Sequence, residues 1–147
     1  MTPTSALRSR IMRAVKSRDT APELVVRRLA HGMGYRFRLH RRELPGTPDL
    51  VFPCRRTVLF VNGCFWHGHN CRRGRRRPKR NAAYWRRKIG RNRGRDRAAA
   101  ASLRGAGWRV GIVWECELAA LSAVRRRLRK LLGRRPAWPR PRKKERR

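Results

Sequence analysis

One short stretch of the chain holds most of the residue types that could do chemistry. Residues 63–71, GCFWHGHNC, contain two of the four cysteines, two of the four histidines and the adjacent pair Phe65 and Trp66. Thiolate sulfur and imidazole nitrogen in one tight loop suit a tetrahedral zinc ion. Flat aromatic side chains in a strongly basic chain suit stacking on nucleic-acid bases. The stretch therefore predicts a zinc loop, and raises the question of whether it also borders a catalytic site.

The spacing of possible ligands predicts where the zinc ion would bind. Cys64, His69 and Cys71 form the pattern C-x4-H-x-C and supply three ligands from one loop. A structural zinc site takes four ligands, and Cys116 is the natural fourth because it follows an apolar stretch that predicts a strand. Spacing alone does not decide whether His69 or His67 is the ligand. The alternative to a metal site is a set of incidental thiols.

Two carboxylates and one histidine are candidates for catalysis. Asp49 follows the turn at residues 44–48 and suits Mg²⁺, which takes one or two protein oxygens. Its alternative role is to hydrogen-bond nearby turn amides. Glu23 ends the sequence Thr20-Ala21-Pro22-Glu23, a capping-box pattern that would explain it without any catalytic role. If His69 binds zinc, His67 is left as an imidazole suited to general-base catalysis near neutral pH.

The tryptophans and one phenylalanine separate into two groups. Phe65 and Trp66 interrupt a polar loop, and Trp85 lies near the start of a predicted helix. Aromatic wedges of this kind can enter a DNA duplex between base steps, at a cost of about a few kcal/mol per step that is lower at a mismatch. The alternative for Phe65 and Trp66 is packing against their own loop. Trp108 and Trp114 frame an apolar strand and are expected in the core.

The charge of the chain indicates its partner. The 147 residues include 42 Lys and Arg but only 8 Asp and Glu, for a formal net charge of +34. A domain so unbalanced is relieved by a polyanion, and we expect nucleic acid rather than a membrane. No apolar run approaches the roughly 18 residues of a membrane-spanning helix. We expect a cytosolic protein, in which clustered cysteines bind metal rather than form disulfides; Cys54 has no ligand-like neighbour.

The apolar periodicity predicts one α/β or α+β domain with a central mixed sheet flanked by helices. The order of elements is a helix, three strands, a helix, a strand and a helix. The helices are expected at residues 20–34, 82–104 and 118–132, and the strands at 35–39, 49–52, 57–61 and 108–114. Asn81 is a candidate cap for the second helix, whose interior Gly90 and Gly94 weaken. Residues 1–18 form a basic arm, 19–132 the folded domain and 133–147 a basic tail expected to be disordered.

Read together, several of these motifs resemble the very-short-patch repair (Vsr) endonuclease family. The resemblance covers most of the chain, from about residue 9 to residue 118. Its most specific part is the GCFWH run combined with the distant Trp-Glu-Cys. The residues that carry it are Arg18-Asp19-Thr20, Glu23, Pro48-Asp49, Phe60-Val61-Asn62-Gly63-Cys64-Phe65-Trp66-His67, Tyr84-Trp85, Lys88-Ile89, Arg95-Asp96-Arg97, Gly107-Trp108-Arg109-Val110 and Val113-Trp114-Glu115-Cys116.

The resemblance implies a restriction-endonuclease-like fold and a role for each candidate residue. It implies Asp49 and the main-chain oxygen of Val61 as Mg²⁺ ligands, His67 as general base and Glu23 as support for metal-bound water. It assigns His69, not His67, to a structural zinc with Cys64, Cys71 and Cys116. Asn62 stands where a histidine is common in this family. The residues it places against DNA are Phe65, Trp66 and Trp85 as intercalators and Met12 in the N-terminal arm.

These expectations define one leading function and one rival. The leading function is a Mg²⁺-dependent endonuclease that nicks one strand 5′ of the T in a T:G mismatch left by deamination of 5-methylcytosine, which starts very-short-patch repair. The rival is a non-catalytic, zinc-stabilised nucleic-acid-binding protein, which would need neither Asp49 nor His67. For the leading function we expect double-stranded DNA as the partner, mismatch-repair proteins as further partners, a monomer, and a bacterial cytoplasmic location at the nucleoid.

Overall fold

The computed structural model describes residues 19–134. The predictions for the basic arm at residues 1–18, including Met12, and for the tail beyond residue 134 lie outside this range. Within residues 19–134, no helix is both long enough and apolar enough to cross a membrane. The elements are α2 (Ala21–Gly32), β1 (Arg38–Leu39), β2 (Leu50–Phe52), η1 (Pro53–Arg55), β3 (Thr57–Asn62), α3 (Arg72–Arg75), α4 (Ala82–Gly105), β4 (Arg109–Trp114), η2 (Glu115–Ala119) and α5 (Leu121–Leu132).

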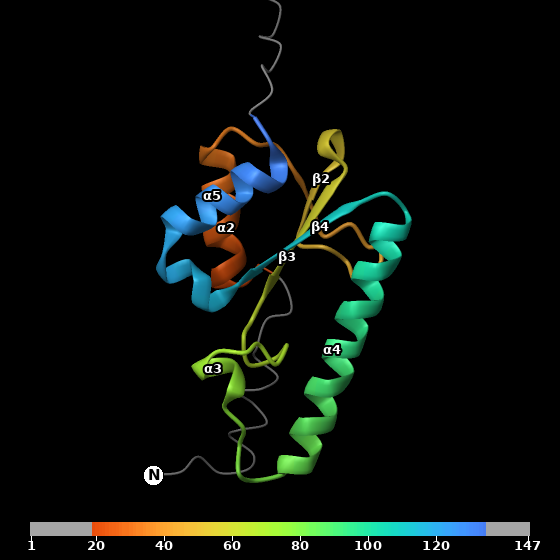
Figure 1. The fold of residues 1–147 in the computed structure, drawn as a ribbon, viewed down its shortest axis with the longest axis vertical. Coiled ribbons are helices and arrows are strands. Elements are labelled where there is room, and N and C mark those ends of the chain that lie inside the picture. The colour runs from red at the N-terminus through yellow and green to blue at the C-terminus, as the bar shows by residue number, and fades with distance from the viewer. Residues whose placement is uncertain (1–18, 135–147) are drawn as a thin grey trace, which may run out of the picture.

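The strands form one mixed sheet in the order β1-β2-β3-β4. β1 pairs with β2 and β2 with β3 in antiparallel fashion, whereas β3 and β4 are parallel. The chain crosses from β3 to β4 through α4, because parallel neighbours need a long connection. Helices α2 and α5 cover one face of the sheet and α4 covers the other (Figure 1). The predicted mixed sheet flanked by helices is confirmed.

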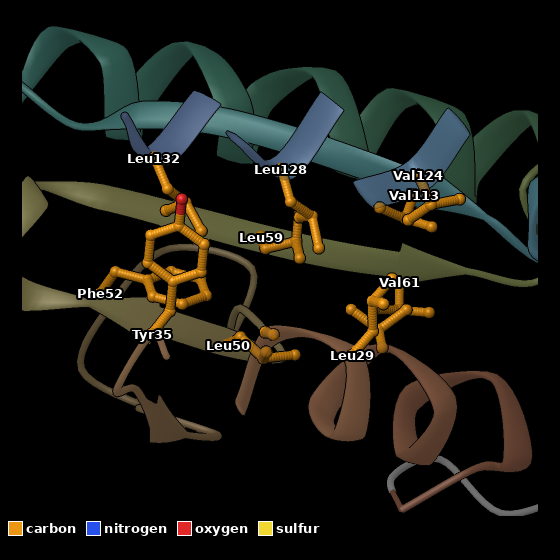
Figure 2. Close-up of a cluster of buried hydrophobic side chains, with 12 residues drawn as sticks. Leu29, Tyr35, Leu50, Phe52, Leu59, Val61, Val113, Val124, Leu128 and Leu132 are labelled. Carbon is orange, nitrogen blue, oxygen red and sulfur yellow. The ribbon is translucent and has the colours of Figure 1, made fainter. Parts of the chain in front are cut away.

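The core follows the alternation of side chains along the central strands. Leu59 and Val61 of β3 point toward α2 and α5, whereas Val58 points toward α4 and packs with Leu103. Figure 2 shows the larger cluster, in which α5 lays its leucines across the sheet. Both faces of β2 and β3 are buried, so these strands are apolar throughout and position whatever follows them. The buried members of the larger cluster are Val26, Leu29, Ala30, Tyr35, Leu50, Phe52, Leu59, Val61, Val113, Val124, Leu128 and Leu132.

The strand predicted at residues 35–39 was wrong over most of its length. Only Arg38 and Leu39 pair with β2, and both are exposed. The amide of Tyr35 is instead bound to the carbonyl of Ala30, which closes the end of α2 through Gly34 in the left-handed region. The alternation of apolar and basic residues that suggested a strand has another cause. Tyr35 and Phe37 lie in a loop and pack edge-to-face on Phe52.

Other differences concern element ends and short helices. Helix α4 runs unbroken through Gly90 and Gly94, and no side chain packs at either position. Asn81 occupies its N-cap, but in the left-handed conformation and without a side-chain cap bond. Helix α3 lies in the basic stretch after residue 71, where no element was predicted. The last helix begins at Leu121, because residues 115–119 form the separate turn η2.

Candidate active site and metal centre

The parallel pairing of β3 with β4 brings two distant segments to one edge of the sheet. The last paired residues are Asn62 and Trp114. Cys64 and Cys116 each follow two residues later, so both cysteines leave the sheet at the same edge. Asp49 precedes β2, and its antiparallel pairing with β3 places the Asp49 carboxylate beside Val61. The sheet topology therefore gathers the candidate acid and the candidate metal ligands at the ends of the same strands.

Asp49 and Val61 are in direct contact. Oδ2 of Asp49 accepts a hydrogen bond of 2.6 Å from the Val61 amide. Burial raises the pKa of Asp49 to about 7, and the nearby Glu23 carboxylate adds to the rise, while the Val61 amide opposes it. A half-buried carboxylate beside a second carboxylate is costly without a cation. The chemistry of these oxygen donors fits a hard divalent metal ion.

Glu23 takes part in capping α2, as its sequence context suggested, but its side chain binds the amide of Asp19 instead of that of the N-cap residue Thr20. It is 2% exposed in the first turn of α2. Its amide donates to Oγ1 of Thr20 at 3.4 Å, while its own Oε2 accepts from the amide of Asp19 at 2.9 Å, one residue before the cap. The same carboxylate lies close enough to Asp49 to perturb its pKa. Glu23 can therefore both cap α2 and act beside Asp49 in a catalytic site.

His67 is paired with a residue that the sequence reasoning left without a role. Its Nδ1 lies 2.6 Å from Oδ2 of Asp96, which projects from α4. A carboxylate on Nδ1 favours the tautomer with the proton on that nitrogen and leaves Nε2 free to accept a proton. The sequence placed Asp96 in the Arg95-Asp96-Arg97 motif but could not pair it with His67, because the two residues lie 29 positions apart.

Four predicted ligands converge in the structure. The sulfurs of Cys64, Cys71 and Cys116 and a ring nitrogen of His69 all lie within 4.8 Å of one another. His69 belongs to this group and His67 does not, so the geometry favours His69 in the choice that spacing left open. Cys54 is exposed in η1 and takes no part. Three thiols and one imidazole form a donor set for a soft or borderline metal in four-fold coordination.

Backbone amides prepare the sulfurs for a cation. The amide of Gly74 donates to Sγ of Cys71 at 3.2 Å, and this bond is the main reason that the pKa of Cys71 falls to about 7. The amide of Cys116 donates to Sγ of Cys64 at 3.4 Å. Burial nevertheless raises the pKa of Cys64 to about 12 and raises that of Cys116. A metal ion at the centre of the cluster would offset the cost of burying these thiolates.

His69 is fixed from two directions. Trp114 stacks on its ring with centroids 4.2 Å apart and planes 12° apart. This corrects the prediction that Trp114 is a core residue; Trp108, in contrast, packs against the smaller core cluster. On the backbone side, α3 passes so close that a Cβ at Gly74 would lie 2.0 Å from the carbonyl oxygen of His69. Only glycine fits there, so Gly74 supports the Cys/His cluster although the sequence did not single it out.

The aromatic residues of the loop meet those of α4. The rings of Phe65, Trp66 and Trp85 lie 5.3 to 5.8 Å apart in edge-to-face pairs, and Tyr84 extends the group. The ammonium of Lys88 lies over three of the rings, 5.5 to 5.8 Å from their centroids. The predicted DNA-contacting aromatics thus form one partly exposed cluster with a cation beside it, next to His67 in the same loop.

Comparisons with known protein sequences point to one family. A sequence model of the family described as "DNA mismatch endonuclease Vsr" matches residues 2–73. The chain is 57% identical over 122 residues to a type II nicking enzyme, V.XorIIP, of Xanthomonas oryzae, covering 83% of this chain and 89% of that protein. It is 46% identical over 113 residues to the DNA mismatch endonuclease Vsr of Escherichia coli, covering 77% and 72%.

A further relative extends over more of the chain. The type II nicking enzyme V.NmeAIP of Neisseria meningitidis is 39% identical over 129 residues, covering 88% of this chain and 91% of the relative. Identity at this level over most of both sequences confirms the resemblance drawn from the motifs. The chain therefore belongs to the Vsr family of DNA mismatch endonucleases.

Proposed function

We propose that this protein nicks one strand of duplex DNA on the 5′ side of the T in a T:G mismatch, and so starts the repair of deaminated 5-methylcytosine. The observation that supports the proposal best is the contact of the Asp49 carboxylate, close to Glu23, with the Val61 amide at the end of β3. The loop that follows β3 carries both the His67–Asp96 pair and a partly exposed aromatic cluster. Family membership supplies the reaction class, and two of the relatives carry the word "nicking" in their names.

In this mechanism each side chain has a separate task. Asp49 and the main-chain oxygen of Val61 would hold Mg²⁺, which when bound offsets charge on the scissile phosphate and the leaving oxygen. His67 takes the proton from the attacking water at Nε2 while Asp96 holds Nδ1–H. The water oxygen bonds to phosphorus, and the bond from phosphorus to the leaving oxygen breaks. Glu23 hydrogen-bonds the water molecules near Asp49.

The aromatic cluster and the Cys/His centre would prepare the substrate and the loop. Phe65, Trp66 and Trp85 would enter the duplex beside the mismatch, where unstacking costs least. A structural zinc on Cys64, His69, Cys71 and Cys116 would fix the loop that carries His67. We also propose that the protein acts as a monomer at the bacterial nucleoid, in contact with mismatch-repair proteins.

The first prediction separates catalysis from binding. Asp49→Ala and His67→Ala should bind a T:G duplex as wild type does but lose strand nicking, by about 10²–10⁴-fold for the missing base. Nicking in the presence of Mg²⁺ is followed on denaturing gels against a matched T:A duplex. Binding without nicking by the wild type would instead favour the rival, a non-catalytic zinc-stabilised nucleic-acid-binding protein. Equal nicking by Asp49→Ala would remove Asp49 from the mechanism.

The second prediction concerns the orientation of His67. Asp96→Asn should lower the nicking rate by about 10–10²-fold at unchanged DNA affinity, because the imidazole loses the partner that fixes its tautomer. Glu43→Gln, which removes an exposed carboxylate paired with Arg41, serves as a control and should leave the rate within about twofold of wild type. Single-turnover rates measure both. An unchanged rate in Asp96→Asn would show that the pair is not used.

The third prediction concerns the Cys/His centre. Metal analysis of the purified protein should find about one zinc per chain, and Cys116→Ala should lose it. Gly74→Ala should also lose zinc, because its Cβ would collide with the carbonyl of His69. Gly90→Ala is the matched control: it has free space, so it should keep zinc and stabilise α4 by up to about 1 kcal/mol. Full zinc in Gly74→Ala would contradict the packing seen here.

The fourth prediction follows from the raised pKa of Asp49, about 7 against an ordinary 3.8. Between these values the folded state holds the proton that the unfolded state has lost, so the free energy of unfolding of the metal-free protein should fall as pH rises from 4 to 8. Asp49→Asn should weaken this slope. Mg²⁺ binds the ionised carboxylate, so its stabilisation should be larger at pH 8 than at pH 5. Thermal melts with and without Mg²⁺ measure both effects. A stability of the metal-free protein that rises with pH over this range would show that burial does not raise the pKa of Asp49.

A further inference from the structure

A second group of ligand-like atoms shares Glu23 with the proposed active site. Asp19, Glu23 and His40 each place one carboxylate oxygen or ring nitrogen within 4.8 Å of the others, an arrangement that could hold a cation. The guanidinium of Arg27 already contacts all three of these side chains, in the position that a bound cation would take. Nη2 of Arg27 lies 2.7 Å from Oδ1 of Asp19, 3.1 Å from Oε2 of Glu23 and 2.9 Å from Nε2 of His40.

The protonation states in this group follow from the chemistry of arginine. A guanidinium keeps its proton in proteins and can only donate, so a hydrogen bond at the 2.9 Å contact with Nε2 of His40 requires that nitrogen to accept. The same nitrogen lies 3.4 Å from Oδ1 of Asp19. The Arg27 side chain is 13% exposed and that of Glu23 3%, which makes them a buried ion pair one helical turn apart. Among the described residues, the hydrogen bonds of the guanidinium run through Nη2, while Nε is buried without a partner.

The backbone has an uncommon conformation where it supplies the partners of Arg27. Asp19 and His40 both have positive φ, 54° and 46°, which few non-glycine residues adopt. These two residues close on the guanidinium from outside α2. The arrangement therefore holds Arg27 in one place.

Arg27 acts on the active site through Glu23. The Glu23 carboxylate touches Arg27 on one side and perturbs Asp49 on the other. The positive charge of Arg27 opposes the effect of Glu23 on Asp49. We propose that Arg27, locked by Asp19 and His40, is a positioning residue that keeps the Glu23 carboxylate aimed at Asp49 and supplies a built-in cation behind the Mg²⁺ site. This inference rests on the proposed nicking function, in which Glu23 orders water near Asp49.

The test compares Arg27→Met with Arg28→Met, the exposed neighbour on α2 with the same change of charge. Single-turnover nicking of the T:G duplex at saturating Mg²⁺, the Kd for that duplex and the melting temperature are measured for each. Arg27→Met should lower the nicking rate by at least about tenfold at unchanged Kd, as expected for a residue that orients a metal-site group. Arg28→Met should change the rate less than about twofold. Arg27→Lys, which keeps the charge but not the planar fork, should restore part of the rate.

A double variant tests whether Arg27 works through Glu23. If it does, adding Arg27→Met to Glu23→Gln should lower the rate less than about twofold further. Multiplying losses would overturn the inference, as would wild-type nicking by Arg27→Met, or a lower melting temperature without a rate defect. Should Arg27→Met fail to fold, His40→Leu takes its place with the same expected dependence on Glu23. A wild type that does not nick would overturn the proposed function together with this inference, whereas a normal rate in Arg27→Met overturns the inference alone.

Discussion

The parallel pairing of β3 with β4 is the constraint on which the rest of the structure depends. It ends both strands at one edge, with Asn62 opposite Trp114. The strand pairing alone brings the loop after β3 next to the turn after β4, and so places Cys116 against Cys64. β3 is buried on both faces, so this edge of the sheet is anchored in the core. A metal ion bound there would fix the 63–71 loop to the central strand of the domain.

The electrostatics of the site show how a chain of net charge +34 uses its few acids. Four of the eight acidic residues, Asp19, Glu23, Asp49 and Asp96, lie in or beside the site. Each has a basic or amide partner in contact. The other four acids stand against 42 lysines and arginines in the full sequence, a balance that favours a polyanion as partner. The four acids in or beside the site are therefore a local exception within a chain whose charge attracts DNA.

The sequence predicted those features that depend on local pattern. The strands around Val58, Leu59 and Val113 follow from continuous apolar runs, and the metal ligands follow from spacing together with the strand before Cys116. The features it missed depend on contacts between distant segments: Asp96 with His67, Arg27 with His40, and Gly74 with His69. The misjudged strand at 35–39 has the same origin, because its alternation serves packing on Phe52 while its backbone ends α2.

The loop can serve the metal centre and the proposed catalytic base at once because of the residue between its two histidines. Gly68 has φ of +59°, and a Cβ there would lie 2.8 Å from Cγ2 of Ile89. This left-handed turn against α4 lets His67 reach Asp96 on the helix while His69 turns back toward Cys116. Any other residue at position 68 would have to adopt an unfavourable positive φ, and its Cβ would collide with Ile89. The turn at Gly68 thus gives the two histidines different surroundings. Composition and ligand spacing do not report such a turn, so they could not decide which histidine belongs to the Cys/His cluster.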